Sequence, residues 1–128
     1  DRSINLLQLW IFPEKKAVQP RYDQISIRNL KKRNEFYQIL SPNANDQGVW
    51  IHQNAWMHIG EFTGEKEKIY RLKDNNNGVY VFVIEGRALV DSKCLQKRDA
   101  LGVWETESLN IKADKNSKIL LIEVPMKF

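Results

Sequence analysis

Residues Asn77–Asp91, with the sequence NGVYVFVIEGRALVD, decide the fold of this chain. Every residue from Val79 to Ile84 is apolar, so an extended segment here would be apolar on both faces, as in a strand that is buried on both sides. Gly86 follows and is free to adopt the positive φ of a tight turn, so the next residues are expected to return antiparallel. The stretch therefore predicts a core hairpin within a closed or sandwiched β-structure.

Short β-forming segments recur along the rest of the chain and are separated by turn residues. The predicted strands cover residues 4–12, 35–40, 49–62, 67–72, 99–105, 108–113 and 118–124, with a bulge expected at Gly60. Residues 27–32 are compatible with one helical turn, the only helix that the pattern allows. Many short strands with turns every eight to twelve residues indicate an all-β sandwich or jelly roll.

Length and composition set further bounds. A chain of 128 residues forms one domain that needs no disulfide or metal for stability. Its net charge of +4 is spread among 16 carboxylates, which is typical of a solvated surface and argues against nucleic-acid binding. No apolar run approaches the ~20 residues of a membrane span, and the single cysteine, Cys94, is expected to be buried and inert. A cytoplasmic location fits best.

Three residues of the segment 49–62 are candidates for a ligand cavity. Alternation places His52, Trp56 and His58 on one face, where a histidine would serve as an acid-base residue and Trp56 as a stacking wall. A single histidine on a strand is more often a hydrogen-bonded structural group, and tryptophans on strands, here Trp10, Trp50, Trp56 and Trp104, mostly fill cores. His52 and His58 would stand ~20 Å apart on a continuous strand, too far to share an ion. We expect no metal and no catalytic residue in this chain.

The segment before residue 25 is predicted to be a separate arm. Its residues 14–24 contain two prolines and scattered charges, which favour an irregular path over a surface. Trp10, Phe12 and Tyr22 are then left with little local structure to bury them, so they are candidates for an interdomain contact. The predicted organisation is an arm over residues 1–24 and a single domain over residues 25–128.

Several of these segments together carry a family resemblance. LQLWIFP at residues 7–13 and PRYDQ at residues 20–24 resemble the start of the second half of pirin-like, quercetinase-like bicupins. IHQNA at residues 51–55, VYVFVIEG at residues 79–86 and LLIEVP at residues 120–125 resemble later signatures of the same half. The resemblance therefore spans nearly the whole chain.

The resemblance implies a cupin, a double-stranded β-helix, that forms the C-terminal half of a two-domain protein. It further implies that the N-terminal half holds the metal site and any quercetin 2,3-dioxygenase-like activity. No residue here matches the metal-binding motif, so the expected role is structural and partner-binding, the partner being the N-terminal half or a second copy of the chain. The alternative is a free-standing cupin enzyme, or a binder of a small aromatic ligand in the barrel cavity.

Overall fold

The computed structural model describes residues 33–45, 48–51 and 53–126, and this part of the chain contains strands and no helix. Its strands are β1 (Phe36–Ser41), β2 (Val49–Trp50), β3 (Trp56–Phe62), β4 (Lys66–Arg71), β5 (Asn77–Glu85), β6 (Arg87–Val90), β7 (Lys93–Gln96), β8 (Ala100–Val103), β9 (Ser108–Ala113) and β10 (Ser117–Pro125). In the described part, no helix has the length and apolarity needed to span a membrane.

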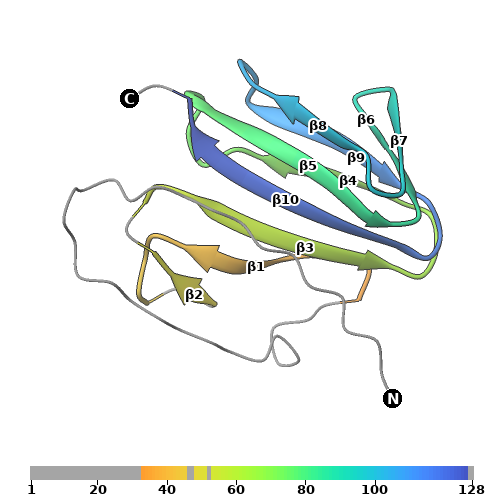
Figure 1. Ribbon diagram of the computed structural model, residues 1–128, viewed down its shortest axis with the longest axis horizontal. Helices are drawn as coiled ribbons and strands as arrows, with labels where there is room; N and C mark the ends of the chain where they lie inside the picture. Colours follow the sequence, from red (N-terminus) through yellow and green to blue (C-terminus); the bar gives the residue numbers. More distant parts are fainter. Residues whose placement is uncertain (1–32, 46–47, 52, 127–128) are drawn as a thin grey trace.

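The strands form two sheets that pack face to face (Figure 1). Sheet A has six strands in the order β2-β1-β3-β10-β5-β8, and sheet B has four in the order β4-β9-β6-β7. Apart from the parallel pair β1 and β2, the ladders are antiparallel. The last strand, β10, lies in the middle of sheet A between β3 and β5.

The main core lies between the two sheets and follows from alternation along their strands. In β5, Val79, Val81 and Val83 are at most 2% exposed and point toward sheet B, while Tyr80 between them is 45% exposed. Leu121 of β10 pairs with Val81, and Ile111 of β9 faces them from sheet B. Burial of these branched side chains contributes roughly 1.5–3 kcal/mol each, which makes this layer the main source of stability.

A second apolar cluster lies on the outer face of sheet A, the face turned away from sheet B. Its buried members are Met57, Leu120 and Ile122, and the half-buried residues packed against them are Ile39, Leu40, Ile59, Phe82, Ile84 and Val124. Sheet A is therefore apolar on both faces, as the run from Val79 to Ile84 predicted. The two faces differ in their burial. Sheet B covers the inner face, whereas the outer face is partly exposed at β5.

Gly86 has the expected positive φ, 83°, but the predicted hairpin is wrong. Strand β5 pairs with β10 and β8 in sheet A, and β6 pairs with β9 and β7 in sheet B, so the turn at Gly86 carries the chain from one sheet to the other. A Cβ at this position would lie 2.7 Å from Cα of Ser117, so the site requires glycine both for its backbone and for space. The Ser117 hydroxyl donates to the carbonyl of Arg87 at 2.9 Å and accepts from its amide at 3.1 Å. This turn is thereby tied to the start of β10.

The all-β two-sheet arrangement is confirmed, and besides the hairpin four further local predictions are wrong. Residues 49–62 do not form one strand, because the chain leaves the sheet between β2 and β3, and the bulge expected at Gly60 lies instead on β1 between Gln38 and Leu40. Strand β7 was not predicted at all. Cys94 is exposed because it alternates with the buried Leu95 on this short edge strand, and Trp104 is 57% exposed because it lies beyond the end of β8. Residues 4–12, 27–32 and the predicted arm lie outside the described part.

Candidate functional site

A buried carboxylate marks one end of the space between the sheets. Glu123 of β10 is fully buried, and its Oε1 accepts a hydrogen bond from the Tyr70 hydroxyl at 2.6 Å. Its Oε2 accepts from the Lys73 amide at 2.7 Å and from Nδ2 of Asn77, also at 2.7 Å. Three donors thus compensate a charge that would otherwise be costly to bury.

The local sequence explains how this cluster assembles. Glu123 has the same parity on β10 as the core residues Ile119 and Leu121, so its side chain must point between the sheets. Tyr70 is the last residue of β4 whose side chain points between the sheets. The turn from Lys73 to Asn77 places the Lys73 amide and the Asn77 side chain over the carboxylate. The pKa of Tyr70 is raised by burial and by its hydrogen bond to Glu123, so the phenol remains a proton donor at neutral pH.

His58 lies beside this cluster on β3. It is 8% exposed, and its ring contacts that of Tyr70 edge to face, with centroids 5.2 Å apart and planes at 73°. Burial, followed by the charge of Lys73, lowers the pKa of His58 from 6.5 to about 4. The imidazole is therefore neutral at physiological pH, and within the described residues its buried Nδ1 has no hydrogen-bond partner.

The structure places two of the predicted cavity residues together. Trp56 and His58 share one face of β3, and Trp56 pairs with Glu123 across the ladder. Trp56 is half-buried at the same end of the interior. His52 lies outside the described residues, as do Trp10, Phe12 and Tyr22, so the predicted interdomain contact stays a prediction.

Chemically, this arrangement is a closed hydrogen-bond network with one neutral imidazole at its side. Both oxygens of Glu123 already accept hydrogen bonds, and Tyr70 uses its proton on Oε1. In the part of the chain that the structure describes, no three His, Cys, Asp or Glu side chains come together as a metal-binding group. The cluster as it stands orders the sheets and the β4–β5 turn.

Sequence reasoning missed Glu123, Tyr70 and Asn77. A signal was present for the first of them, because a carboxylate within the run ILLIEV must occupy a core-facing position if that run is a buried strand. Its partners could not be identified in the same way. Tyr70 and Asn77 are 53 and 46 residues from Glu123 in the sequence, and only the packing of the two sheets brings them to it.

Comparison with known proteins identifies related sequences. A family model described as the quercetinase C-terminal cupin domain matches residues 38–124. The quercetin 2,3-dioxygenase of Escherichia coli K12 is 25% identical over 122 residues, which cover 95% of this chain and 51% of that protein. A putative quercetin 2,3-dioxygenase of Pasteurella multocida is 26% identical over 125 residues, covering 97% of this chain and 52% of the relative.

Solved structures show the same relation. YhhW from E. coli has a TM-score of 0.80 and 25% identity, with coverage of 91% of this chain and 48% of that one. YhaK from E. coli shares the fold, with a TM-score of 0.65 and 19% identity over 77% of this chain and 43% of its own. The chain thus spans about half the length of the curated relatives that it matches.

Proposed function

Because the chain belongs to the quercetinase C-terminal cupin domain family, we propose that it is the structural and partner-binding half of a bicupin protein. Its partner is the N-terminal cupin half of the same protein, which carries any metal-dependent quercetin 2,3-dioxygenase-like activity. The relatives support this division, since each extends to about twice the matched length. In this proposal the chain contributes a rigid surface to the bicupin and provides neither a metal site nor a catalytic residue.

The observation that carries the proposal is an apolar area on the outer face of sheet A, which we call the outer patch. It consists of Tyr80, Phe82, Ile84, Ala100, Gly102 and Met126. Tyr80 pairs with Gly102 and Phe82 with Ala100, so large side chains of β5 stand beside small residues of β8. Tyr80 is 45% and Met126 47% exposed, which is unusual for large apolar groups that adjoin a buried cluster.

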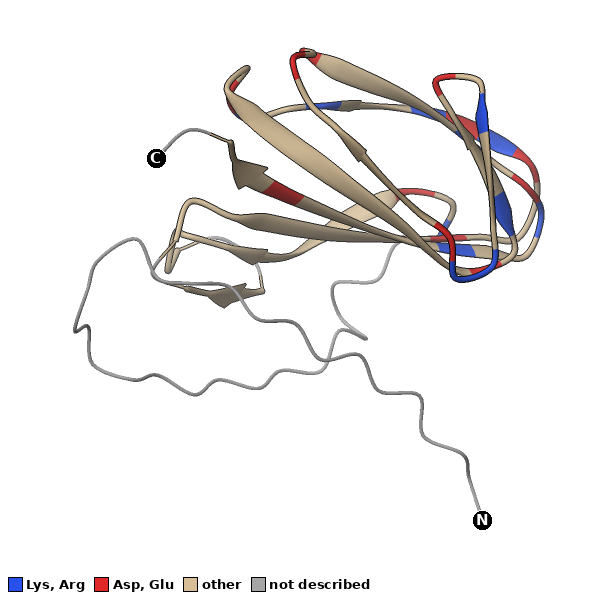
Figure 2. Ribbon diagram, turned by 45° about the horizontal axis from the view of Figure 1, so that its top comes forward, with Lys and Arg blue, Asp and Glu red and all other residues tan. Residues whose placement is uncertain are grey.

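The distribution of charge also favours this face. Figure 2 shows Lys, Arg, Asp and Glu gathered on sheet B and on the turns, whereas the long strands of sheet A are uncharged over most of their length. Strands β1, β2 and β8 contain no charged residue, and β4 alone contains four. Interfaces between permanently associated domains are depleted in charge at their centre, so the outer patch has the composition that such a contact requires.

The buried cluster supports the metal-free part of the proposal. A carboxylate that ligates a metal needs free lone pairs directed at an open position, whereas Glu123 directs both oxygens at internal donors. His58 lies beside this network, against the ring of Tyr70. Recruiting Glu123 to an ion would require the network to break.

The partner-binding part is tested by mixing the 128-residue chain with the N-terminal half of the same protein and measuring the complex by sedimentation velocity. Tyr80→Asp places a charge in the outer patch and should weaken the complex by about thirtyfold or more, as expected for an interface centre. Ile69→Asp is the matched control, because Ile69 is 61% exposed on β4 of the other sheet, and it should leave the affinity unchanged. Equal binding by the Tyr80 variant and the wild-type chain would refute the proposal.

The metal-free part is tested by elemental analysis of the purified chain. We expect far less than one transition-metal ion per chain and no oxygen consumption with quercetin. One iron, copper, nickel or zinc ion per chain that is lost on His58→Ala would establish a metal site here and overturn this part.

A further inference from the structure

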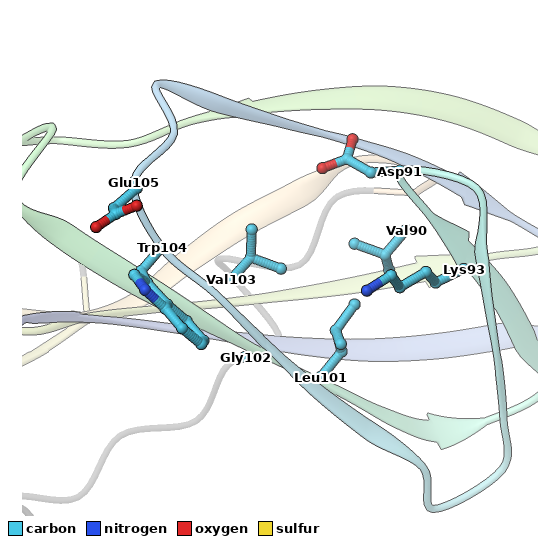
Figure 3. Close-up of a pocket in the computed structure, with 8 residues that line it drawn as sticks. All are labelled: Val90, Asp91, Lys93, Leu101, Gly102, Val103, Trp104 and Glu105. Carbon is cyan, nitrogen blue, oxygen red and sulfur yellow. The ribbon is translucent and has the colours of Figure 1, made fainter.

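The two sheets are not joined at one edge, and a pocket opens there. Sheet A ends at β8 and sheet B ends at β7, with no ladder between these two strands. The opening encloses a pocket of about 390 Å³. Its lining residues are Val90, Asp91, Lys93, Leu101, Gly102, Val103, Trp104 and Glu105 (Figure 3).

The wall toward the core is apolar. Val90 is fully buried in the main core, and Leu101 and Val103 are half-buried against it. Leu101 and Val103 pair with Val81 and Val79, so both point inward from the edge of sheet A. The pocket therefore reaches the side of the core layer, and a ligand there would be shielded from water on one side.

An aromatic ring and a single cation complete the lining. The Trp104 indole is 57% exposed at one end of the pocket, beside Val103. At the other end Lys93 extends its side chain across the opening toward Leu101 (Figure 3). Lys93 shares the inward parity of β7 with Leu95, which explains why its stem lies over apolar neighbours.

The two carboxylates at the rim do not neutralise Lys93. Asp91 Oδ1 accepts the amide of Asn110 at 2.9 Å, and Glu105 lies at the opposite end, next to Trp104. Among the described residues, Lys93 forms no ion pair. The pocket thus presents an aromatic face and an unpaired ammonium, with an apolar wall between them.

We propose that this pocket binds a small planar aromatic carboxylate, a function separate from the docking of the N-terminal half. The ring of the ligand lies against the Trp104 indole and over Leu101 and Val103, where stacking and burial stabilise it. Its carboxylate accepts hydrogen bonds from the Lys93 ammonium, a contact between opposite charges that is strengthened by the apolar surroundings. The pocket volume lies within the range of small-molecule sites, at its lower end.

The test is a titration of the 128-residue chain with 2-naphthoate, followed by the indole N–H resonance of Trp104 in a ¹H–¹⁵N spectrum. We expect this resonance to shift with a Kd on the order of 1 mM, from the usual efficiency of a ligand of this size. Lys93→Met keeps the apolar stem and should weaken binding about fivefold. Lys115→Met is the control, because this exposed residue follows β9 at the opposite end of sheet B.

Two further probes separate the ring from the charge. The neutral 2-naphthylmethanol should bind the wild-type chain about fivefold more weakly than 2-naphthoate, and Lys93→Met should not alter its affinity. The spectra themselves report that each variant is folded. The proposal is overturned if Trp104 does not respond to 2-naphthoate, if the Lys93 and Lys115 variants behave alike, or if the cation 2-naphthylmethylamine binds more tightly than the carboxylate.

Discussion

Replacing Tyr70 by phenylalanine removes one hydroxyl from the buried carboxylate network and little else. The ring keeps its edge-to-face contact with His58, and Glu123 keeps its hydrogen bonds from the Lys73 amide and from Asn77. What is lost is the bond of 2.6 Å between the hydroxyl and Oε1 of a fully buried carboxylate. The change therefore isolates one charge-assisted hydrogen bond.

The expected cost follows from that geometry. A hydrogen bond to a charged group contributes about 1.5–3 kcal/mol to the free energy of unfolding. Complete loss of compensation would cost about 3–5 kcal/mol, but two donors remain, so we expect the lower range, about 2 kcal/mol. For a domain of this size that corresponds to a fall in Tm of roughly 6–12 °C.

Urea unfolding followed by circular dichroism measures this free energy directly. Tyr80→Phe is the matched control, because Tyr80 is 45% exposed on the outer face of sheet A and has no part in the network. Its unfolding free energy should stay within about 0.5 kcal/mol of the wild-type value. A Tyr70 variant that is equally close to wild type would show that the network does not stabilise the fold.

Three further predictions concern other features. The pKa of about 4 for His58 lies below its ordinary 6.5, so protonation of this side chain favours the unfolded chain. The free energy of unfolding should therefore fall as the pH drops below about 6.5. Urea titrations at about pH 7.5 and pH 5 measure this loss, and about 2 kcal/mol of it should be absent in His58→Gln. Gly86→Ala should lower the free energy of unfolding by about 2 kcal/mol or more in the same assay, because φ is 83° at this residue and Ser117 occupies the space that a Cβ would need. Gly64→Ala is the control and should cost under about 1 kcal/mol, because no atom lies within 4 Å of its Cβ position. Cys94 is exposed, so a thiol reagent should modify it in the native chain with no lag for unfolding; protection until urea is added would contradict its placement on β7.

Local pattern predicted much of the fold, and long-range pairing explains the rest. The strand at Val79–Ile84 follows from its unbroken apolar run, and residues 108–113 were predicted with their observed bounds. Glycine's backbone freedom indicated a turn at Gly86 but not its outcome, because β6 joins the other sheet instead of pairing with β5. The break between β2 and β3 could not be predicted, because both segments are rich in β-forming residues and only the parallel pairing of β1 with β2 separates them. Strand β7 is four residues long and mostly polar, so it has no periodic signal of its own.

For the candidate site, the sequence placed Trp56 and His58 on one face but gave no account of what lies opposite them. That face is completed by Glu123, which arrives on the last strand, and by Tyr70, which arrives from the other sheet. Core-facing parity would have identified the carboxylate. Its donors depend on how the turn from Lys73 to Asn77 folds over it, which no short-range pattern encodes.

The central position of β10 constrains how the domain is made in the cell. A ribosome releases the chain from its N-terminal side, so β3 and β5 both emerge before the strand that hydrogen-bonds to each of them. Until β10 arrives, two long strands expose unpaired backbone edges, which are templates for pairing with other chains. Sheet A can therefore close only after synthesis has passed residue 125, and a nascent chain stalled earlier would need a chaperone to keep these edges apart.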